Sequence, residues 1–441
     1  MDQSRRDFLK TFAIGTAGIA IGTHAKSYAR ILGANDRVNF AVIGLHGRGY
    51  AHLASIHACD NAALTHICDV DSRELAKFAT VAKEKYQQSP AQNKDFRKLL
   101  DAKDVDAITI ATPEHWHAPM AIMGLQAGKH VYVEKPCSHN PHEGNLLVQA
   151  QKKYMRLVQM GNQQRSSPHT IEIMKKIHDG LIGRPYLGRS WYSNNRKSIG
   201  IGKEVQVPQE LDWELWQGPA PRRPYKDNVH PYNWHWFWHW GTGETLNNGT
   251  HEVDLCRWAL GVGYPSRVSA SGGRYHYKDD WEFYDTLSAN FEYGDSMISW
   301  EGLSCEPKLT YGRSRGAVIV GTKGSVLVDR DGYEVYDLDD KKIDEFVVGK
   351  NSTSADLMSI DSMTDDHFRN LVNGIRHGEA LHSPIEEGNI SVTTLQLANI
   401  SWKLQRTLKL NETDGSVKGD PEAEGLCRRE YEKGWELKIE N

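Results

Sequence analysis

The sequence predicts an α/β protein with two domains. A doubly wound Rossmann domain is expected at residues 37–161, followed at 162–441 by an α/β domain with a large, open and mostly antiparallel sheet. Continuous apolar runs alternate with helical segments up to residue 161, which is typical of a parallel sheet covered on both faces. A glycine-rich turn follows the first run, and after residue 168 hairpin turns separate shorter strands. A chain of 441 residues is long enough for both domains.

In the first domain, apolar runs and glycine stops give the boundaries of the elements. The run at 38–43 is apolar almost throughout, as in a strand buried on both faces, and Gly128 ends one of the helices. The expected strands are 38–43, 63–68, 106–111, 130–133 and 157–160, and the expected helices are a segment ending at Cys59 and residues 72–86, 95–100, 117–127 and 141–154.

The second domain is expected to carry the substrate and to make contacts between subunits of a homo-oligomer. Glycine-containing turns at 294–295 and 321–324 predict hairpins. A long insertion at 193–243 contains many tryptophans and shows no clear secondary structure. The expected strands are 186–192, 267–277, 285–293, 297–303, 317–321 and 325–328, and the expected helices are 168–178, 365–377 and 385–408.

The first 29 residues predict an export signal. Arg5 and Arg6 precede Phe8 and Leu9, an uncharged stretch covers 11–23, and small residues near Ala29 suit a cleavage site. This order resembles a twin-arginine signal, which carries folded proteins to the periplasm. An ordinary secretory signal or a cytosolic amphipathic helix are the alternatives. The apolar stretch is short and rich in glycine and alanine, so no membrane insertion is expected after cleavage.

The composition excludes some partners and favours reduced cysteines. Lys plus Arg total 53 and Asp plus Glu total 57, for a net charge of −4, so no nucleic-acid footprint is expected. The six cysteines show no CxxC spacing. Because a twin-arginine substrate folds in a reducing cytosol, we expect mostly free and buried thiols.

The turn after the first strand predicts a dinucleotide site. It reads Gly44-Leu45-His46-Gly47-Arg48-Gly49 and opens a helix, so backbone N–H groups and the helix dipole can face a pyrophosphate. Asp69 ends the second strand, where a carboxylate can bond ribose hydroxyls and would repel a 2′-phosphate. NAD is therefore expected and NADP is less favoured, although Arg73 leaves the choice open. His46 stands where the second glycine of the usual motif would lie. The alternative is a tight turn that binds nothing.

Two further motifs follow neighbouring strands at the same edge of the sheet. The segment 112–117 comes after one strand, and Glu134 with Lys135 comes after the next. Ligands of open α/β sheets bind at this edge, and a lysine with a lowered pKa can assist proton movement there. Either segment alone could be an ordinary polar loop. The expected cofactor-binding residues are Gly44, His46, Gly47, Arg48, Gly49, Asp69, Thr112, His115, His117, Glu134 and Lys135.

Together the turn, Asp69, the segment 112–117, the sequence 127–131 and Glu134-Lys135-Pro136 resemble the glucose–fructose oxidoreductase / inositol dehydrogenase / MocA family. The resemblance extends over nearly the whole mature chain. It implies substrate bound between a Rossmann domain and an open-sheet domain, and hydride exchange between a sugar or polyol carbinol and nicotinamide. It also implies a catalytic or substrate-positioning role for Lys135 and a place on the cofactor side of the site for Glu134.

In polyol-oxidising members of that family, an aspartate typically stands four residues before a histidine that faces the carbinol. Here His251 has the histidine position and would be the general acid/base. Asn247 stands at the aspartate position, and an amide cannot take up a proton. The expected catalytic residues are thus Lys135, His251 and Asn247. The alternative for His251 is a capping or packing role at a helix start, and Asp254 is expected to be structural.

The aromatic tract 231–240 is expected to be mostly core or subunit interface, with a minority of rings at the substrate. Trp234 and His235 are the expected substrate contacts from this tract. Arg165 is another candidate, or else a surface ion-pair residue. His235 and His239 have the spacing of a helical metal pair, but no further metal-binding pattern accompanies them, so no metal is expected.

Three functions remain open from the sequence. The leading hypothesis is an exported NAD-dependent sugar or polyol oxidoreductase, whose NAD must be tightly bound because the periplasm should not supply it. The second is a glycosidase that forms a transient keto-sugar with no net redox change. This is how the NAD-dependent α-N-acetylgalactosaminidases work, and they resemble the Rossmann half of the chain. The third is a non-catalytic sugar-binding protein.

Overall fold

The computed structural model describes residues 37–348 and 362–439. The segment predicted to be an export signal lies outside these ranges. Residues from Val38 onward form one compact unit, and the description that follows concerns this unit. Within the described residues, no helix is both long enough and apolar enough to cross a membrane.

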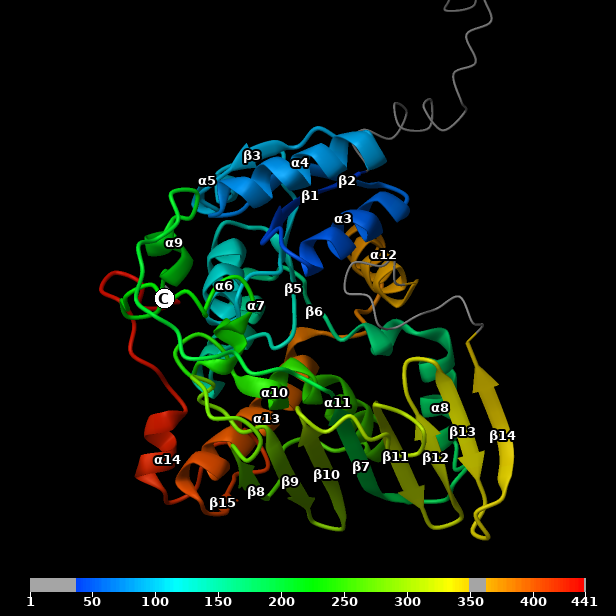
Figure 1. Ribbon diagram of the computed structural model, residues 1–441. Coiled ribbons are helices and arrows are strands. Elements are labelled where there is room, and N and C mark those ends of the chain that lie inside the picture. The colour runs from blue at the N-terminus through cyan, green and yellow to red at the C-terminus, as the bar shows by residue number, and fades with distance from the viewer. Residues whose placement is uncertain (1–36, 349–361, 440–441) are drawn as a thin grey trace, which may run out of the picture. The chain divides into compact units, whose positions relative to one another are not determined.

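The first sheet is a six-stranded parallel Rossmann sheet with strand order β3-β2-β1-β4-β5-β6. Helices connect its strands, as the alternating pattern predicts (Figure 1). The short strand β3 was not predicted from the sequence, because its side chains are too polar and exposed to form an apolar run. The strands are β1 Val38–Ile43, β2 Ala62–Cys68, β3 Ala91–Asn93, β4 Ala107–Ile110, β5 His130–Val133 and β6 Val158–Met160. The helices are α3 Arg48–Ala58, α4 Ser72–Tyr86, α5 Arg97–Leu100, α6 His117–Gln126 and α7 Pro141–Tyr154.

The second sheet has nine strands in the order β14-β13-β12-β11-β7-β10-β9-β8-β15. Its neighbours are antiparallel except β7 and β10, so the predicted open, mostly antiparallel sheet is confirmed. Both predicted hairpin turns are present, since Tyr293 pairs with Ser296 and Gly321 pairs with Gly324. The strands are β7 Pro185–Ser193, β8 Arg267–Gly273, β9 Thr286–Tyr293, β10 Ser296–Leu303, β11 Arg315–Gly321, β12 Gly324–Val328, β13 Gly332–Tyr336, β14 Lys342–Val347 and β15 Leu408–Lys409.

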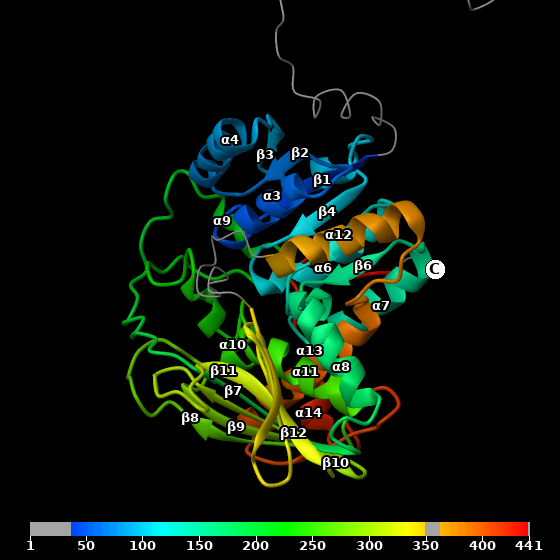
Figure 2. The same cartoon turned by 90° about the vertical axis from the view of Figure 1, so that its right-hand side faces the viewer.

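Helices cover the face of this sheet that is turned toward the Rossmann domain (Figures 1 and 2). The predicted helix 385–408 is too long: α13 ends at Leu404, because Gln405 adopts a left-handed conformation and the chain then forms β15. The predicted strand 267–277 likewise ends early, at Gly273. The helices of this part are α8 Pro168–His178, α10 Gly243–Asn247, α11 Gly249–Leu260, α13 Ile385–Leu404 and α14 Pro421–Leu426.

Helix α12, Ser362–His377, follows the second sheet in the chain but packs beside α3 on the Rossmann sheet (Figure 2). Phe368 is fully buried and stacks on Tyr132 of β5, with 4.4 Å between ring centroids. The hydroxyl of Ser55 in α3 donates to Asp365 at 2.6 Å. Helix α12 therefore ties the C-terminal half of the chain to the Rossmann sheet.

The insertion 193–243 folds around its own aromatic core. It contains α9 Trp213–Gln217 and the 3-10 helix η3 Asn233–Trp236. Trp213 stacks on Trp216 at 4.6 Å, and Trp240 packs edge-on against both. The expectation that most rings of the tract 231–240 are core is confirmed for Trp234, Trp236, Phe237 and Trp240. All six cysteines are free and four are buried, as expected for a protein with mostly reduced thiols.

Replacing Phe368 with alanine tests the tie made by α12. The change removes a fully buried ring, so we expect Phe368→Ala to lower the free energy of unfolding by about 3–5 kcal/mol. Urea unfolding followed by circular dichroism measures the change. The control Tyr275→Ala removes a ring that is 74% exposed and should cost less than about 0.5 kcal/mol. Equal losses in the two variants would contradict the packing role of α12.

Candidate active site

The turn between β1 and α3 depends on its glycines. Gly44 has a φ of 87°, and a Cβ there would lie 2.6 Å from the backbone of Ala111. A Cβ at Gly49 would lie 2.4 Å from the carbonyl oxygen of Gly44. At Gly47, by contrast, no heavy atom lies within 4 Å of a built Cβ, and the neighbouring His46 is exposed. The start of α3 therefore has open space on the side where a pyrophosphate would approach.

Asp69 joins the end of β2 to this turn. One carboxylate oxygen accepts from the backbone N–H of Leu45 at 2.8 Å, and the other accepts from the N–H of Asp71 at 2.9 Å. Burial raises the pKa of Asp69 to about 6. Arg73, the residue that could still favour NADP, forms an ion pair with the side chain of Asp71 at 2.6 Å. The glycine cradle and this carboxylate fit a dinucleotide without a 2′-phosphate.

Glu134, at the end of β5, is bound to the same turn. Its carboxylate accepts from Arg48 Nε at 2.7 Å, from His52 Nε2 at 2.9 Å and from Gln163 Nε2 at 3.3 Å. Burial by itself would raise the pKa of Glu134, but Arg48 and His52 outweigh it and hold the pKa below the usual range. The carboxylate is therefore charged, and it links the helix of the phosphate turn to the strand end that carries Lys135.

Lys135 and Asn247 are brought together by the fold. The ammonium group donates to the backbone carbonyl of Asn247 at 2.6 Å and lies 3.4 Å from its side-chain oxygen. The Asn247 amide nitrogen lies 3.4 Å from Glu244 Oε1. A carboxylate at position 247 would face that of Glu244, which gives a physical reason for the amide. Burial lowers the pKa of Lys135, opposed by the charges of Glu134 and Glu114.

His251 lies on α11, close to these groups. It is 5% exposed, and its Nδ1 atom has no hydrogen-bond partner in the described part of the chain. Burial holds the pKa of His251 well below its usual value, and Arg330, Arg315 and Lys135 act in the same direction. The imidazole is therefore neutral near pH 7 and has a nitrogen that can accept a proton.

Glu114 is a candidate that the sequence analysis missed. It is 2% exposed and accepts from the hydroxyl of Thr242. Burial raises its pKa to about 7, although the Thr242 hydrogen bonds and the charge of Lys135 oppose this. The residue stands inside the motif 112–117, but only the fold brings Thr242 and Lys135 close to it. Other charged groups also reach the site: Glu244 binds Arg196, and Glu252 binds Arg315 at 2.7 Å.

Two predicted cofactor contacts have structural partners instead. His115 has no exposed surface, and its Nε2 donates to the carbonyl of Trp216 at 2.9 Å, which leaves no accessible atom for a cofactor. The ring of His117 lies between two carbonyls, those of Pro136 at 2.6 Å and Thr112 at 2.8 Å. His117 thus holds the two strand-end loops together and positions Thr112.

Of the three predicted substrate contacts, Arg165 and Trp234 make internal contacts, and His235 lies near Lys135. Arg165 is neither at the surface nor free for a ligand, because it makes a buried, two-point ion pair with Asp254, with N···O distances of 2.6 and 3.0 Å. Trp234 stacks on His235 at 3.6 Å and belongs to the core of the insertion. Burial holds the pKa of His235 well below its usual value, and Lys135 is among the charges that act on it, so this ring lies near Lys135.

The spacing of His235 and His239 does not produce a shared metal site. His235 Nδ1 donates to the carbonyl of Tyr232 at 2.7 Å, and His239 Nε2 donates to that of Pro221 at 2.6 Å. Across residues 37–348 and 362–439, no group of three His, Cys, Asp or Glu side chains is arranged to hold a metal ion.

Comparison with known families assigns the chain to a class. A profile described as "Oxidoreductase family, NAD-binding Rossmann fold" matches residues 38–162, and one described as "GFO/IDH/MocA C-terminal domain" matches residues 170–327. The chain belongs to the GFO/IDH/MocA family, and its Rossmann domain is an NAD-binding domain. The predicted family, fold and cofactor are therefore confirmed.

The chain is also similar to particular proteins. It is 30% identical over 226 residues to a glycosyl hydrolase family 109 protein of Saccharopolyspora erythraea, covering 47% of this chain and 49% of that protein. It thus spans about half the length of the curated relatives it matches. Among solved structures, levoglucosan dehydrogenase in complex with NADH and levoglucosan has a TM-score of 0.65 at 19% identity, covering 85% of this chain and 99% of that one. A putative myo-inositol dehydrogenase of Sinorhizobium meliloti has a TM-score of 0.61 at 18% identity, covering 84% and 99%.

Replacing Asp69 tests the cofactor preference. We expect Asp69→Ala to weaken NADH binding about tenfold, because a charged acceptor for ribose is lost, and to weaken NADPH binding much less. Fluorescence titration with each nucleotide measures both affinities. Asp95→Ala, which removes a carboxylate that binds the side chain and the backbone N–H of Arg97, is the control and should change neither affinity. A similar loss for both nucleotides in Asp69→Ala would contradict the assigned role.

The raised pKa of Asp69 also predicts a pH dependence. Its charged form is disfavoured by folding, so its contribution to stability is complete below its ordinary pKa near 4 and is lost as the pH rises through about 6. Nucleotide discrimination has the opposite sign, because only the carboxylate repels a 2′-phosphate. We expect the preference for NADH over NADPH to shrink as the pH falls through about 6 in the wild type, and to be flat in Asp69→Ala.

Proposed function

We propose that this protein is an NAD-dependent oxidoreductase that acts on a carbinol group of a sugar or polyol. The observation that carries the proposal is the bond of 2.6 Å from Lys135 to the backbone of Asn247. It places the ammonium group of the Rossmann domain against α10 and α11, next to the strand end whose Glu134 binds the phosphate turn. Family membership and the sugar-binding structural neighbours support the substrate class.

Bound NAD would supply the hydride chemistry at the carbinol carbon. The protein's own groups manage the proton and the orientation of the substrate. Burial and the nearby cations lower the pKa of His251 and keep it neutral. Its Nδ1, which has no partner among the described residues, can then take the carbinol proton. Lys135 has one N–H directed to Asn247, and its other N–H groups can donate to the substrate oxygen. Asn247 holds Lys135 without adding a second negative charge beside Glu244.

A second candidate function is redox-neutral glycoside cleavage through a transient keto-sugar. The similarity to glycosyl hydrolase family 109 proteins favours it, as does Glu114, whose pKa of about 7 suits a group that gives a proton to a leaving oxygen. In this cycle the carbinol would be oxidised to a ketone, the substituent eliminated, water added in its place and the ketone reduced again by the hydride taken up in the first step. Sugar release without net NADH formation distinguishes this function from the first.

We further propose that the protein is exported in folded form and works as a homo-oligomer. The Arg5-Arg6 motif supports export, and tightly bound NAD is compatible with it. Exposed apolar side chains on the second sheet support self-association, because exposed apolar surface often marks an interface. They include Tyr186 of β7, Met297 of β10 and Ile343, Phe346 and Val347 of β14.

Replacing Lys135 tests the catalytic set. We expect Lys135→Met to lower kcat by about 10²-fold or more with a smaller change in KM, because the hydrogen-bond donor to the substrate oxygen is lost while the stem is kept. Purified protein is assayed on free sugars and on glycosides, with NADH absorbance and released sugar followed in parallel. The exposed control Lys152→Met should keep wild-type rates. If neither Lys135→Met nor His251→Gln changed any activity, the non-catalytic sugar-binding function would be favoured.

Replacing the arginine pair tests export. We expect Arg5→Lys together with Arg6→Lys to leave the protein in the cytoplasm, because the twin-arginine pathway reads that pair. Cell fractionation and immunoblotting measure the distribution. Lys10→Arg, which leaves the pair intact, is the control. Unchanged export of the double variant would contradict a twin-arginine signal.

A further inference from the structure

The insertion 193–243 reaches the edge of the Rossmann sheet where the cofactor would bind. Strands β2 and β4 lie on either side of β1, so the loops after them flank the glycine turn that follows β1. Residues 210–216 of the insertion, which we call the bridge, include most of α9 and contact both loops. Because Asp69 directly follows β2, the bridge spans the side of the site where the ribose of adenosine would be bound.

The start of the bridge is fastened to the loop after β2 by backbone hydrogen bonds. The N–H of Asp212 donates to the carbonyl of Val70 at 3.0 Å, and the N–H of Ser72 donates to the carbonyl of Glu210 at 3.0 Å. The hydroxyl of Ser72 donates to the same carbonyl at 3.2 Å. The side chain of Val70 packs against the aromatic core of the insertion. The loop that begins with Asp69 is therefore joined to the bridge by both its backbone and its side chains.

The end of the bridge is fastened to the loop after β4. The backbone carbonyl of Trp216 accepts from His115 Nε2 and from Trp116 Nε1, both at 2.9 Å. The N–H of His115 donates to the carbonyl of Trp240, near the end of the insertion, at 3.2 Å. Helix α9, which has five residues, is thus bonded near both of its ends to loops that flank the glycine turn.

The insertion also approaches the glycine turn through His230. Burial lowers the pKa of His230 to about 4, and the charge of Asp71 opposes the shift. Arg73 and His46 add to the lowering, so the ring of His230 lies near the loop after β2 and near the turn. The imidazole is neutral at pH 7. The insertion therefore meets the adenosine side of the site at three places: the loop after β2, the glycine turn and the loop after β4.

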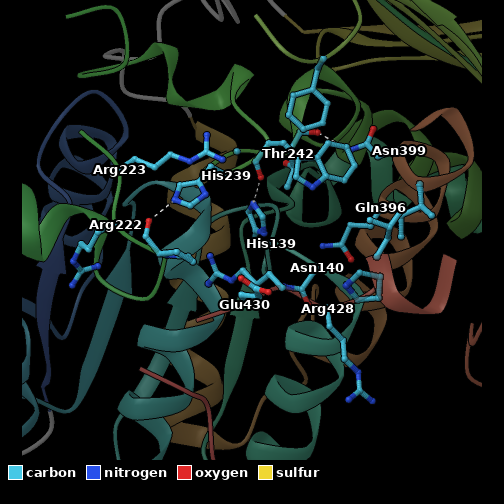
Figure 3. A pocket seen from close by; sticks show the side chains of 18 residues that line it. His139, Asn140, Arg222, Arg223, His239, Thr242, Gln396, Asn399, Arg428 and Glu430 are labelled. Carbon is cyan, nitrogen blue, oxygen red and sulfur yellow. Dashed lines mark hydrogen bonds between the residues drawn. The ribbon is translucent and has the colours of Figure 1, made fainter. Parts of the chain in front are cut away.

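Beyond α9, the insertion borders a cavity of about 360 Å³ (Figure 3). Its segments 221–223 and 238–242 form part of the wall, and the loop before α7, α13 and the segment after α14 form the rest. The two segments are joined to each other, since His239 donates to the carbonyl of Pro221 at 2.6 Å. Protein interiors are close-packed, and a cavity leaves room for displacement. The insertion can therefore shift away from the two loops without disturbing the Rossmann sheet.

We propose that the bridge is a latch that closes the adenosine side of the NAD site and retains the cofactor through successive turnovers. Entry and release of the dinucleotide then require the bonds at one end of the bridge to break. Retained NAD has to be restored in place: the redox-neutral cycle returns the hydride to the same sugar, and the oxidoreductase would pass it to a second, carbonyl substrate. The latch serves either activity, so it does not depend on which reaction is catalysed.

Replacing Ser72 with proline opens the first end of the latch. Ser72 is the first residue of α4, where proline is well tolerated, and Asp71 before it is extended, as a residue before proline prefers. Ser72→Pro removes the N–H that bonds Glu210. The matched control Ser72→Ala keeps that N–H and loses only the hydroxyl.

Replacing Trp116 with phenylalanine loosens the second end. Trp116→Phe removes the indole N–H that bonds Trp216 and keeps an aromatic ring in the core. The matched control is Trp191→Phe, which removes the indole N–H of an equally buried tryptophan that donates to the carbonyl of Arg313 on the second sheet.

Exchange of bound nucleotide measures the latch without any assay of activity. The protein is exchanged overnight into NAD labelled in the adenine and chased with unlabelled NAD, and the label retained after rapid gel filtration gives the dissociation rate. Quenching of tryptophan fluorescence by NADH in nucleotide-free protein gives the association rate. We expect release from the wild type to be slower than about one per minute. The double variant Ser72→Pro with Trp116→Phe should release NAD about tenfold faster or more, and both controls should behave as the wild type does.

A latch has a further signature, because it hinders entry as well as release. The association rate of the double variant should rise together with its dissociation rate, so that Kd changes less than about threefold. Thermal melting followed by circular dichroism shows whether each variant is folded, and each single variant carries the test if the double variant is unstable. Faster release from the wild type, unchanged release from the variants, or faster release with an unchanged association rate would each overturn the proposal. Loss of the proposed sugar chemistry alone would leave these nucleotide rates as expected.

Discussion

The buried carboxylate of Glu134 is the group around which the site is organised. A buried charge is costly unless it is paired, and Arg48 and His52 supply the pairing from α3, directly after the phosphate turn. Because Glu134 directly follows β5 and Lys135 is the next residue, this ion pair fixes the position of Lys135 relative to the turn that opens α3. Thr364 of α12 also accepts from Arg48 at 3.0 Å, so the C-terminal half of the chain contributes to the same contact.

Polar contacts, rather than apolar packing alone, join the Rossmann domain to the substrate side. Lys135 reaches the backbone of Asn247, Glu114 accepts from Thr242, and Arg165 pairs with Asp254. Each contact joins the carboxyl edge of the Rossmann sheet, or the segment just after β6, to α10, α11 or the loop before them. Hydrogen bonds are directional, so such a junction holds Lys135, Glu114 and their partners in one geometry more strictly than apolar packing would.

The elements that could be predicted are those with a local signal. The β1 strand, its glycine turn and α3 follow from an apolar run and from positions where only glycine fits. Strand β14 could not be found, because all six of its side chains are exposed and no alternation marks it. The end of α13 was missed because Gln405, and not glycine, takes the left-handed conformation there. Among the site residues, Arg165 carried no sign that its partner would be Asp254.

The sequence by itself determined the fold class, the cofactor and the strand ends where the chemistry lies, because periodicity, glycine positions and the acid after β2 act over short distances. It also determined that Lys135, Asn247 and His251 were the residues to examine. Only the tertiary structure decided the partners of the polar side chains. It buries His115 in an internal hydrogen bond, and it places Glu114 beside Thr242 and Lys135. Those choices depend on partners about a hundred residues away or more, whose proximity no local pattern records.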